Sequence, residues 1–122
     1  MRRLEVLQWT GLLGGALLWG LGHVVGFGVT EARCTSGGQG WGIHLDLWEG
    51  LINGLAWGLA LAAALASLAV ILATRESSYE SPPPVGRLRF FAIAALVANV
   101  IFMTALVFYV LGTVFNVACR QG

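Results

Sequence analysis

Three long apolar blocks, separated by short polar stretches, most constrain what this chain can fold into. They cover about residues 6–29, 47–73 and 88–117. Each is longer than the about 20 helical residues that cross a bilayer core about 30 Å thick. A membrane-spanning β-strand needs only about 9–11 residues of alternating character, so the block lengths favour helices. The sequence therefore predicts an all-α membrane protein, a single domain of three transmembrane helices.

The composition supports lipid as the solvent of this chain. Of its 122 residues, 57% are hydrophobic and 11% are charged, whereas soluble domains carry about 25% charged residues. A soluble protein of this size has too little interior to hide so much apolar surface. This composition and the net charge of +1 argue against a disordered chain, a secreted disulfide scaffold and a nucleic-acid binder. Membrane lipids are the expected surroundings.

The arginines predict the orientation, because the chain contains no lysine. Five lie at the N-terminus or around the Pro-containing loop 74–87, namely Arg2, Arg3, Arg75, Arg87 and Arg89. The remaining two, Arg33 in the outer loop 30–46 and Arg120 near the C-terminus, fall on the other side. Because basic residues favour the cytoplasm, we expect a cytoplasmic N-terminus and an extracytoplasmic C-terminus. The first block is interpreted as an uncleaved anchor helix, and the protein as a multi-pass protein of a bacterial inner membrane.

The two cysteines fall on the same side of the membrane in this arrangement. Cys34 follows the first span and Cys119 follows the third. An even cysteine count in an oxidising extracytoplasmic space predicts a Cys34–Cys119 disulfide, with two free thiols as the alternative. A redox-active pair is disfavoured because the chain has no Cys-x-x-Cys motif. No metal site is expected, since two thiols and His44 make an incomplete ligand set.

Small residues recur at every fourth position, in the GxxxG-type spacing, along two of the predicted helices. In the second helix these are Gly50, Gly54, Gly58, Ala62 and Ala66, and in the first they are the pairs Gly11–Gly15 and Gly22–Gly26. Such positions let helices approach closely in lipid. They serve either the packing of the three helices on one another or contact with another protein. We expect at least one of these faces to meet a further membrane protein.

His23 is a titratable residue well inside the first predicted span. It precedes Val29 by six residues, which places it about 9 Å from the outer end of the helix. We interpret it as a neutral imidazole that bonds to a neighbouring helix or to interfacial water. The alternative is a haem or quinone ligand, but no cofactor is assigned to this chain. Asn99 and Thr104 are expected to form hydrogen bonds between helices.

Short segments in the first helix, just after it and near the C-terminus resemble those of a known group of membrane proteins. The first helix contains Trp-Gly-Leu-Gly-His over residues 19–23, Cys34 follows it, and residues 115–121 read Phe-Asn-Val-Ala-Cys-Arg-Gln. In these features the chain resembles the small accessory membrane proteins of bacterial haem–copper (cytochrome c) oxidase type respiratory complexes. The resemblance implies a non-catalytic subunit, with haem and copper carried by other chains.

We therefore expect an accessory or structural subunit of a respiratory-type membrane complex, with no catalytic residue of its own. Its small-residue faces would pack on larger integral subunits, and its outer loop would contact a periplasmic domain. One alternative is a small redox protein that binds haem or quinone through His23. Another is a homo-oligomeric channel or transporter, which is disfavoured because no Asp, Glu, Arg or Lys lies in the middle of a span.

Overall fold

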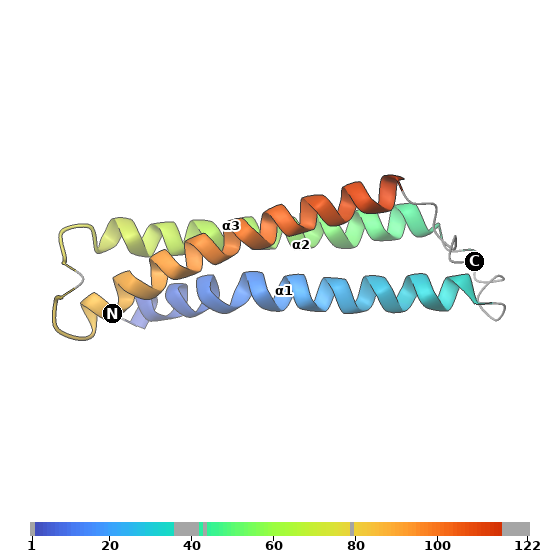
Figure 1. Ribbon diagram of the computed structural model, residues 1–122. Coiled ribbons are helices and arrows are strands. Elements are labelled where there is room, and N and C mark those ends of the chain that lie inside the picture. The colour runs from blue at the N-terminus through green and yellow to red at the C-terminus, as the bar shows by residue number, and fades with distance from the viewer. Residues whose placement is uncertain (1, 36–41, 43, 79, 116–122) are drawn as a thin grey trace.

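The computed structural model describes residues 2–35, 42, 44–78 and 80–115. Over these residues the chain forms three helices and no strand: α1 (Arg2–Cys34), α2 (Leu45–Ala73) and α3 (Val85–Phe115). Consecutive helices run antiparallel in an elongated bundle, so that α1 and α3 run parallel, and each helix contacts the other two (Figure 1). All three are long and apolar enough to cross a membrane. The prediction of an all-helical chain with three candidate spans is confirmed.

Each helix begins before its predicted apolar block, and α1 also continues past it, whereas α2 ends at Ala73 as expected. α1 starts at Arg2 and continues to Cys34, rather than covering 6–29 alone, and the amide of Thr35 still donates to the carbonyl of Glu31 at 3.2 Å. Hydropathy marks where side chains become polar, whereas a backbone helix continues until its hydrogen bonding fails. α3 begins at Val85, ahead of the expected residue 88, because the carbonyl of Pro84 already accepts a bond from the amide of Leu88 at 3.0 Å.

The faces that meet inside the bundle follow a spacing of alternating four and three residues. In α2 the buried positions on this repeat are Glu49, Asn53, Ala56, Ala60, Ala63, Ser67, Val70 and, at the helix end, Thr74, and Ala64 beside them is also buried. In α3 the equivalent positions are Leu88, Ala92, Ala95, Asn99 and Leu106, with Phe102 and Tyr109 partly buried. A mean spacing of about 3.5 residues keeps one face of a helix turned toward its neighbours. We call these the inner faces of α2 and α3.

The loop between α2 and α3 is tied to the start of α3 by a single side chain. The Nη1 atom of Arg89 donates to the carbonyl of Thr74 at 2.8 Å and to that of Arg75 at 2.6 Å, and it also donates to the carbonyl of Ser77. The last carbonyls of a helix have no partner within the helix, and a cation there also complements the helix dipole. Arg89 therefore closes the end of α2.

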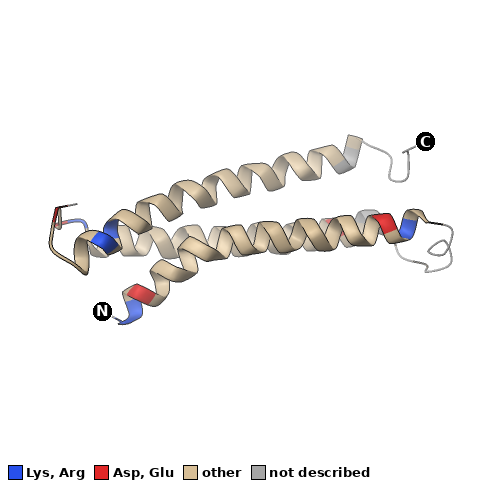
Figure 2. Ribbon diagram, turned by 60° about the horizontal axis from the view of Figure 1, so that its bottom comes forward, with Lys and Arg blue, Asp and Glu red and all other residues tan. Residues whose placement is uncertain are grey.

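Charged side chains gather at the two ends of the bundle (Figure 2). The N-terminus of α1 and the 74–84 loop lie at one end, and this end carries Arg2, Arg3, Arg75, Arg87 and Arg89. Arg33 lies at the opposite end, while Arg120 lies outside the described residues. The fold thus brings together the five arginines on which the expected orientation depends. The orientation in a membrane remains a prediction.

Candidate functional site

The three helices approach most closely around two glycines of α1. Asn99 of α3, only 1% exposed, donates from Nδ2 to the carbonyl of Gly11 at 2.7 Å. A Cβ atom at Gly11 would collide with Oγ of Ser67 in α2, and one at Gly15 would collide with Oδ1 of Asn99. A side chain at either glycine would therefore displace Ser67 or Asn99 from this contact among α1, α2 and α3, and the expected hydrogen bond of Asn99 between helices is present.

The second glycine pair of α1 also faces the bundle. A Cβ atom at Gly22 would stand 3.7 Å from the Cβ of Ala56 in α2, in ordinary contact. One at Gly26 would stand 3.2 Å from the hydroxyl oxygen of Tyr109 in α3. Both small-residue pairs of α1 thus lie against helices of the same chain.

The small-residue row of α2 mostly faces away from the other two helices. Gly50, Gly54 and Gly58 are exposed, and no described atom lies within 4 Å of the position that a Cβ would occupy at any of them. At about 100° per residue, Gly58 lies about 180° around the helix from the middle of the inner face. Ala62 is also exposed, and Ala66 is half-buried where the row turns back toward the bundle. We call Gly50, Gly54, Gly58 and Ala62 the outer stripe.

A polar cluster joins the three helices near the end of the bundle that carries Cys34. Glu49 is only 8% exposed, although it lies in the candidate span Leu47–Ala73. Its Oε1 accepts a hydrogen bond from the hydroxyl of Thr30 at 2.5 Å, and its backbone carbonyl accepts one from Nδ2 of Asn53 at 2.8 Å. The carboxylate also interacts electrostatically with the phenol of Tyr109. An ionisable side chain held by partners inside a span is a candidate functional group.

Sequence reasoning did not single out Glu49 or connect it with Thr30 or Tyr109. A signal was present in the spacing of polar residues along α2. Glu49, Asn53, Ser67 and Thr74 all fall on the alternating four- and three-residue repeat. A polar row with the period of a buried face predicts polar contacts inside a bundle.

His23 lies in a group of aromatic rings between α1 and α3. Its ring stacks on Trp19, with centroids 5.6 Å apart and an interplanar angle of 17°. The ring of Tyr109 meets it edge-on at 5.5 Å, and Trp19 also lies 5.7 Å from Phe102. The imidazole is exposed, and within the described part of the chain no hydrogen bond reaches it. The expected hydrogen bond to a neighbouring helix is therefore absent there, because the side chains that face His23 are aromatic.

Thr104 does not bond between helices, so that prediction is wrong. It is exposed, and its hydroxyl donates to the carbonyl of Val100 in its own helix at 2.9 Å. A threonine hydroxyl reaches the carbonyl one turn back, which satisfies it without a neighbouring helix.

The cysteine at the end of α1 is not a free thiol. Cys34 is disulfide-bonded, while Cys119 lies outside the described residues. The Cys34–Cys119 pairing therefore stays a prediction. His44 stands at the N-cap of α2, exposed and without a side-chain capping bond. Across residues 2–35, 42, 44–78 and 80–115, no three His, Cys, Asp or Glu side chains come together as a metal site.

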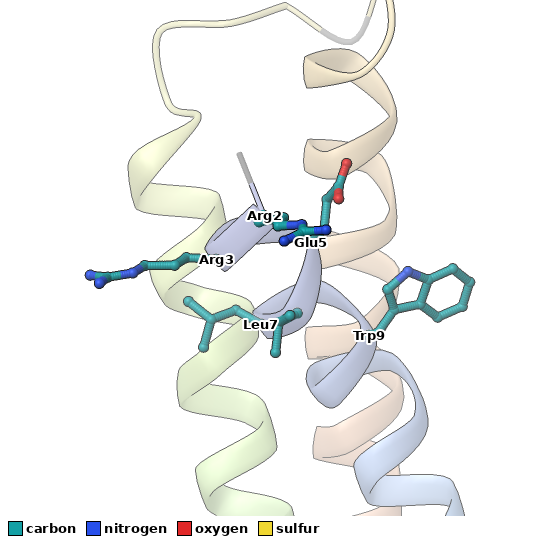
Figure 3. Close-up of a pocket in the computed structure, with 6 residues that line it drawn as sticks. Arg2, Arg3, Glu5, Leu7 and Trp9 are labelled. Atoms are coloured by element: carbon teal, nitrogen blue, oxygen red, sulfur yellow. The ribbon is translucent and has the colours of Figure 1, made fainter.

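A hollow at the arginine-rich end is formed by α1 alone. Its lining residues are Arg2, Arg3, Glu5, Val6, Leu7 and Trp9. Figure 3 shows that Arg3 and Trp9 point to different sides of the helix. Arginine and tryptophan commonly mark the boundary between the hydrocarbon core and water. We interpret this hollow as the boundary region of α1 and not as a binding site, since its polar groups do not converge.

Comparison with protein-family models, with curated proteins and with solved structures finds no match to this chain. The fold and contacts define a three-helix protein with three candidate membrane spans. Its distinctive features are an outward-facing small-residue stripe on α2 and an aromatic and polar group around His23, Tyr109 and Glu49.

Proposed function

We propose that this chain is a non-catalytic accessory subunit of a larger bacterial membrane complex, and that it binds a helix of another subunit along the outer stripe. The observation that carries the proposal is the direction of Gly50, Gly54 and Gly58. They face away from the bundle, while a different face of α2 packs against α1 and α3. Glycine lowers helix propensity by about 1 kcal/mol relative to alanine. Glycines on a free face are accounted for if a further helix approaches there.

The surroundings of the outer stripe fit such a partner. Exposed leucines lie beside the glycines, namely Leu51, Leu55, Leu61 and Leu65. Side chains of this size next to glycines produce ridges beside a shallow furrow, which is the surface that a facing helix packs into. In a bilayer this close packing is the main attraction between helices, because lipid tails are as apolar as leucine. The remaining exposed apolar side chains would contact lipid.

The kind of complex and the orientation are part of the same proposal. The grouped arginines support a cytoplasmic N-terminus and an extracytoplasmic C-terminus in a bacterial inner membrane. Cys34 would then lie outside, where a disulfide holds the outer loop for contact with a periplasmic domain. The resemblance of residues 19–23 and 115–121 to oxidase accessory proteins supports a respiratory complex whose haem and copper belong to other chains.

Affinity purification from native membranes in a mild detergent tests this role. We expect a larger polytopic membrane protein to co-purify with the wild-type chain in a fixed ratio. The double variant Gly54→Ile/Gly58→Ile should lose that partner by about tenfold or more, because two branched side chains fill the furrow. Gly28→Ile is the matched control, since Gly28 is an exposed helical glycine of α1 outside the outer stripe.

Two results would overturn the proposal. One is a wild-type chain that runs alone as a monomer, and the other is a stripe variant that retains the partner as well as Gly28→Ile does. A homo-oligomer that conducts ions or solutes in liposomes would instead support the channel or transporter alternative.

A further inference from the structure

The imidazole of His23 stands on the exposed side of α1, inside a candidate membrane span. His23 precedes Thr30 by seven residues, so it lies about 10 Å along α1 from the Thr30–Glu49 hydrogen bond, toward the middle of the span. Its ring is exposed, and no described group donates to it or accepts from it. A polar N–H in hydrocarbon without an acceptor is costly. An acceptor from outside the chain would remove this cost.

The surroundings of His23 favour a flat ligand that arrives from the lipid. Trp19 stacks on the imidazole at an angle of 17°, and Phe102 extends the aromatic surface. Planar rings associate favourably with such surfaces through offset stacking. Since His23 is exposed on the side of the bundle and not enclosed within it, a ligand would reach it through the hydrocarbon phase. The ligand would therefore be membrane-soluble.

The phenol of Tyr109 stands beside the imidazole, between His23 and the Thr30–Glu49 hydrogen bond. The ring of Tyr109 in α3 meets His23 edge-on at 5.5 Å. The phenol oxygen of Tyr109 lies over Gly26, 3.2 Å from where a Cβ would stand, so the absence of a side chain there leaves it room. Glu49 of α2 interacts electrostatically with this phenol and is hydrogen-bonded by Thr30 of α1. The imidazole of His23 in α1 and the ring of Tyr109 in α3 thus form one side of the site, and Glu49 of α2 lies beyond Tyr109 toward the end of the bundle.

We propose that His23, Trp19 and Tyr109 form a binding site for the headgroup of a membrane-soluble quinone. A quinone combines a planar ring, carbonyl oxygens that accept from an imidazole N–H, and a tail that stays in the lipid. A bis-histidine haem would instead need a second imidazole, and the chain's other histidine, His44, stands at the N-cap of α2 and outside this aromatic group. The site lies on α1 and α3, so it is independent of the role proposed for the outer stripe.

Photolabelling of the full-length chain in phosphatidylcholine nanodiscs tests the site. The probe is a short-tailed benzoquinone that carries an azide, and labelled peptides are identified by mass spectrometry. We expect the label to concentrate on residues 19–26 and 102–109, and an excess of the same quinone without the azide to suppress it. Labelling that follows the lipid-exposed surface of all three helices, or that the competitor does not reduce, would overturn the proposal.

Matched variants test the role of each side chain. His23→Leu should reduce competable labelling by about tenfold, whereas His23→Gln, which keeps an N–H donor, should retain a substantial part of it. Tyr109→Phe keeps the ring and should weaken binding about two- to fivefold. His44→Leu removes the other histidine and should leave labelling unchanged. Equal labelling of His23→Leu and the wild-type chain would overturn the assignment.

Two further results separate the quinone site from the docking role of the outer stripe and from a haem site. Gly54→Ile/Gly58→Ile should label like the wild-type chain, so failure of the docking role does not affect this test. Added haemin that gives a Soret band lost in His23→Leu, with no competable quinone labelling, would overturn the quinone site in favour of haem.

Discussion

Asn99 of α3 donates a hydrogen bond from Nδ2 to the backbone carbonyl of Gly11 in α1 over 2.7 Å, and both residues are buried. The bond joins the first and third helices, which are 88 residues apart at this point in the sequence. Glycine at position 11 exposes its carbonyl to a side chain from another helix. The same glycine leaves room for Ser67 of α2, so three helices meet at one small contact.

Removing the Asn99 amide should loosen the bundle. We expect Asn99→Leu to lower the free energy of unfolding by about 1–2 kcal/mol, because the hydrogen bond to Gly11 is lost and a branched apolar side chain must fit against glycines. Reversible unfolding in mixed micelles, followed by circular dichroism, measures this change. Thr104→Val is the control, since Thr104 bonds only within its own helix. Equal effects of the two substitutions would contradict the role of Asn99.

Adding one methyl group should have opposite effects on stability at the inward-facing glycines of α1 and at the outer stripe of α2. Gly15→Ala should destabilise the fold by about 1–3 kcal/mol, because its Cβ collides with Oδ1 of Asn99. Gly54→Ala meets open space, so it should leave the isolated chain unchanged or stabilise it by up to about 1 kcal/mol through helix propensity. The same micelle unfolding experiment compares them. A destabilising Gly54→Ala would mean that the outer stripe packs within the chain.

Arg89 should protect the loop between α2 and α3. Its guanidinium binds the carbonyls of Thr74, Arg75 and Ser77, so Arg89→Ala should speed amide hydrogen exchange over residues 74–78 by about five- to tenfold. Exchange measured by mass spectrometry on the protein in nanodiscs gives this rate. Arg87→Ala removes an exposed arginine two residues earlier and should have little effect. Similar acceleration in both variants would argue for a general charge effect.

The expected topology places residues 34 and 119 in the same compartment. In Cys34→Ser and Cys119→Ser variants, the remaining thiol should react with a membrane-impermeant maleimide added to intact spheroplasts. The wild-type chain should react only after reduction, because the predicted disulfide blocks both thiols. Reaction of the two single-cysteine variants from opposite sides of the membrane would contradict the topology, the disulfide and the proposed orientation together.

Hydropathy located the helices but not their ends. The three apolar blocks correspond to α1, α2 and α3, because a helix in lipid must be both apolar and long. α1 nevertheless includes Arg2 and Arg33, since helical hydrogen bonds do not depend on the polarity of the side chain. Hydropathy therefore predicts the length of each apolar stretch, and each helix is longer than its apolar stretch.

The candidate site was only partly predictable. His23 was recognised because a titratable residue inside a span is unusual, but its contacts with Trp19 and Tyr109 depend on how α1 and α3 are rotated against each other. Glu49 lies near the start of α2, and its hydrogen bond with Thr30 of α1 likewise depends on how the two helices are rotated against each other. Neither rotation nor depth follows from hydropathy alone.

The amino-acid sequence by itself determined that this chain forms three long apolar helices with most of its arginines at one end, since length, polarity and charge order are properties of the chain alone. Only the tertiary structure decided which small residues of α2 pack inside the bundle. Both faces of α2 offer alanine or glycine at helical spacing, and either could pack. Glu49 turns one face of α2 inward because its carboxylate accepts a hydrogen bond from Thr30 of α1, and this leaves Gly50, Gly54 and Gly58 outside.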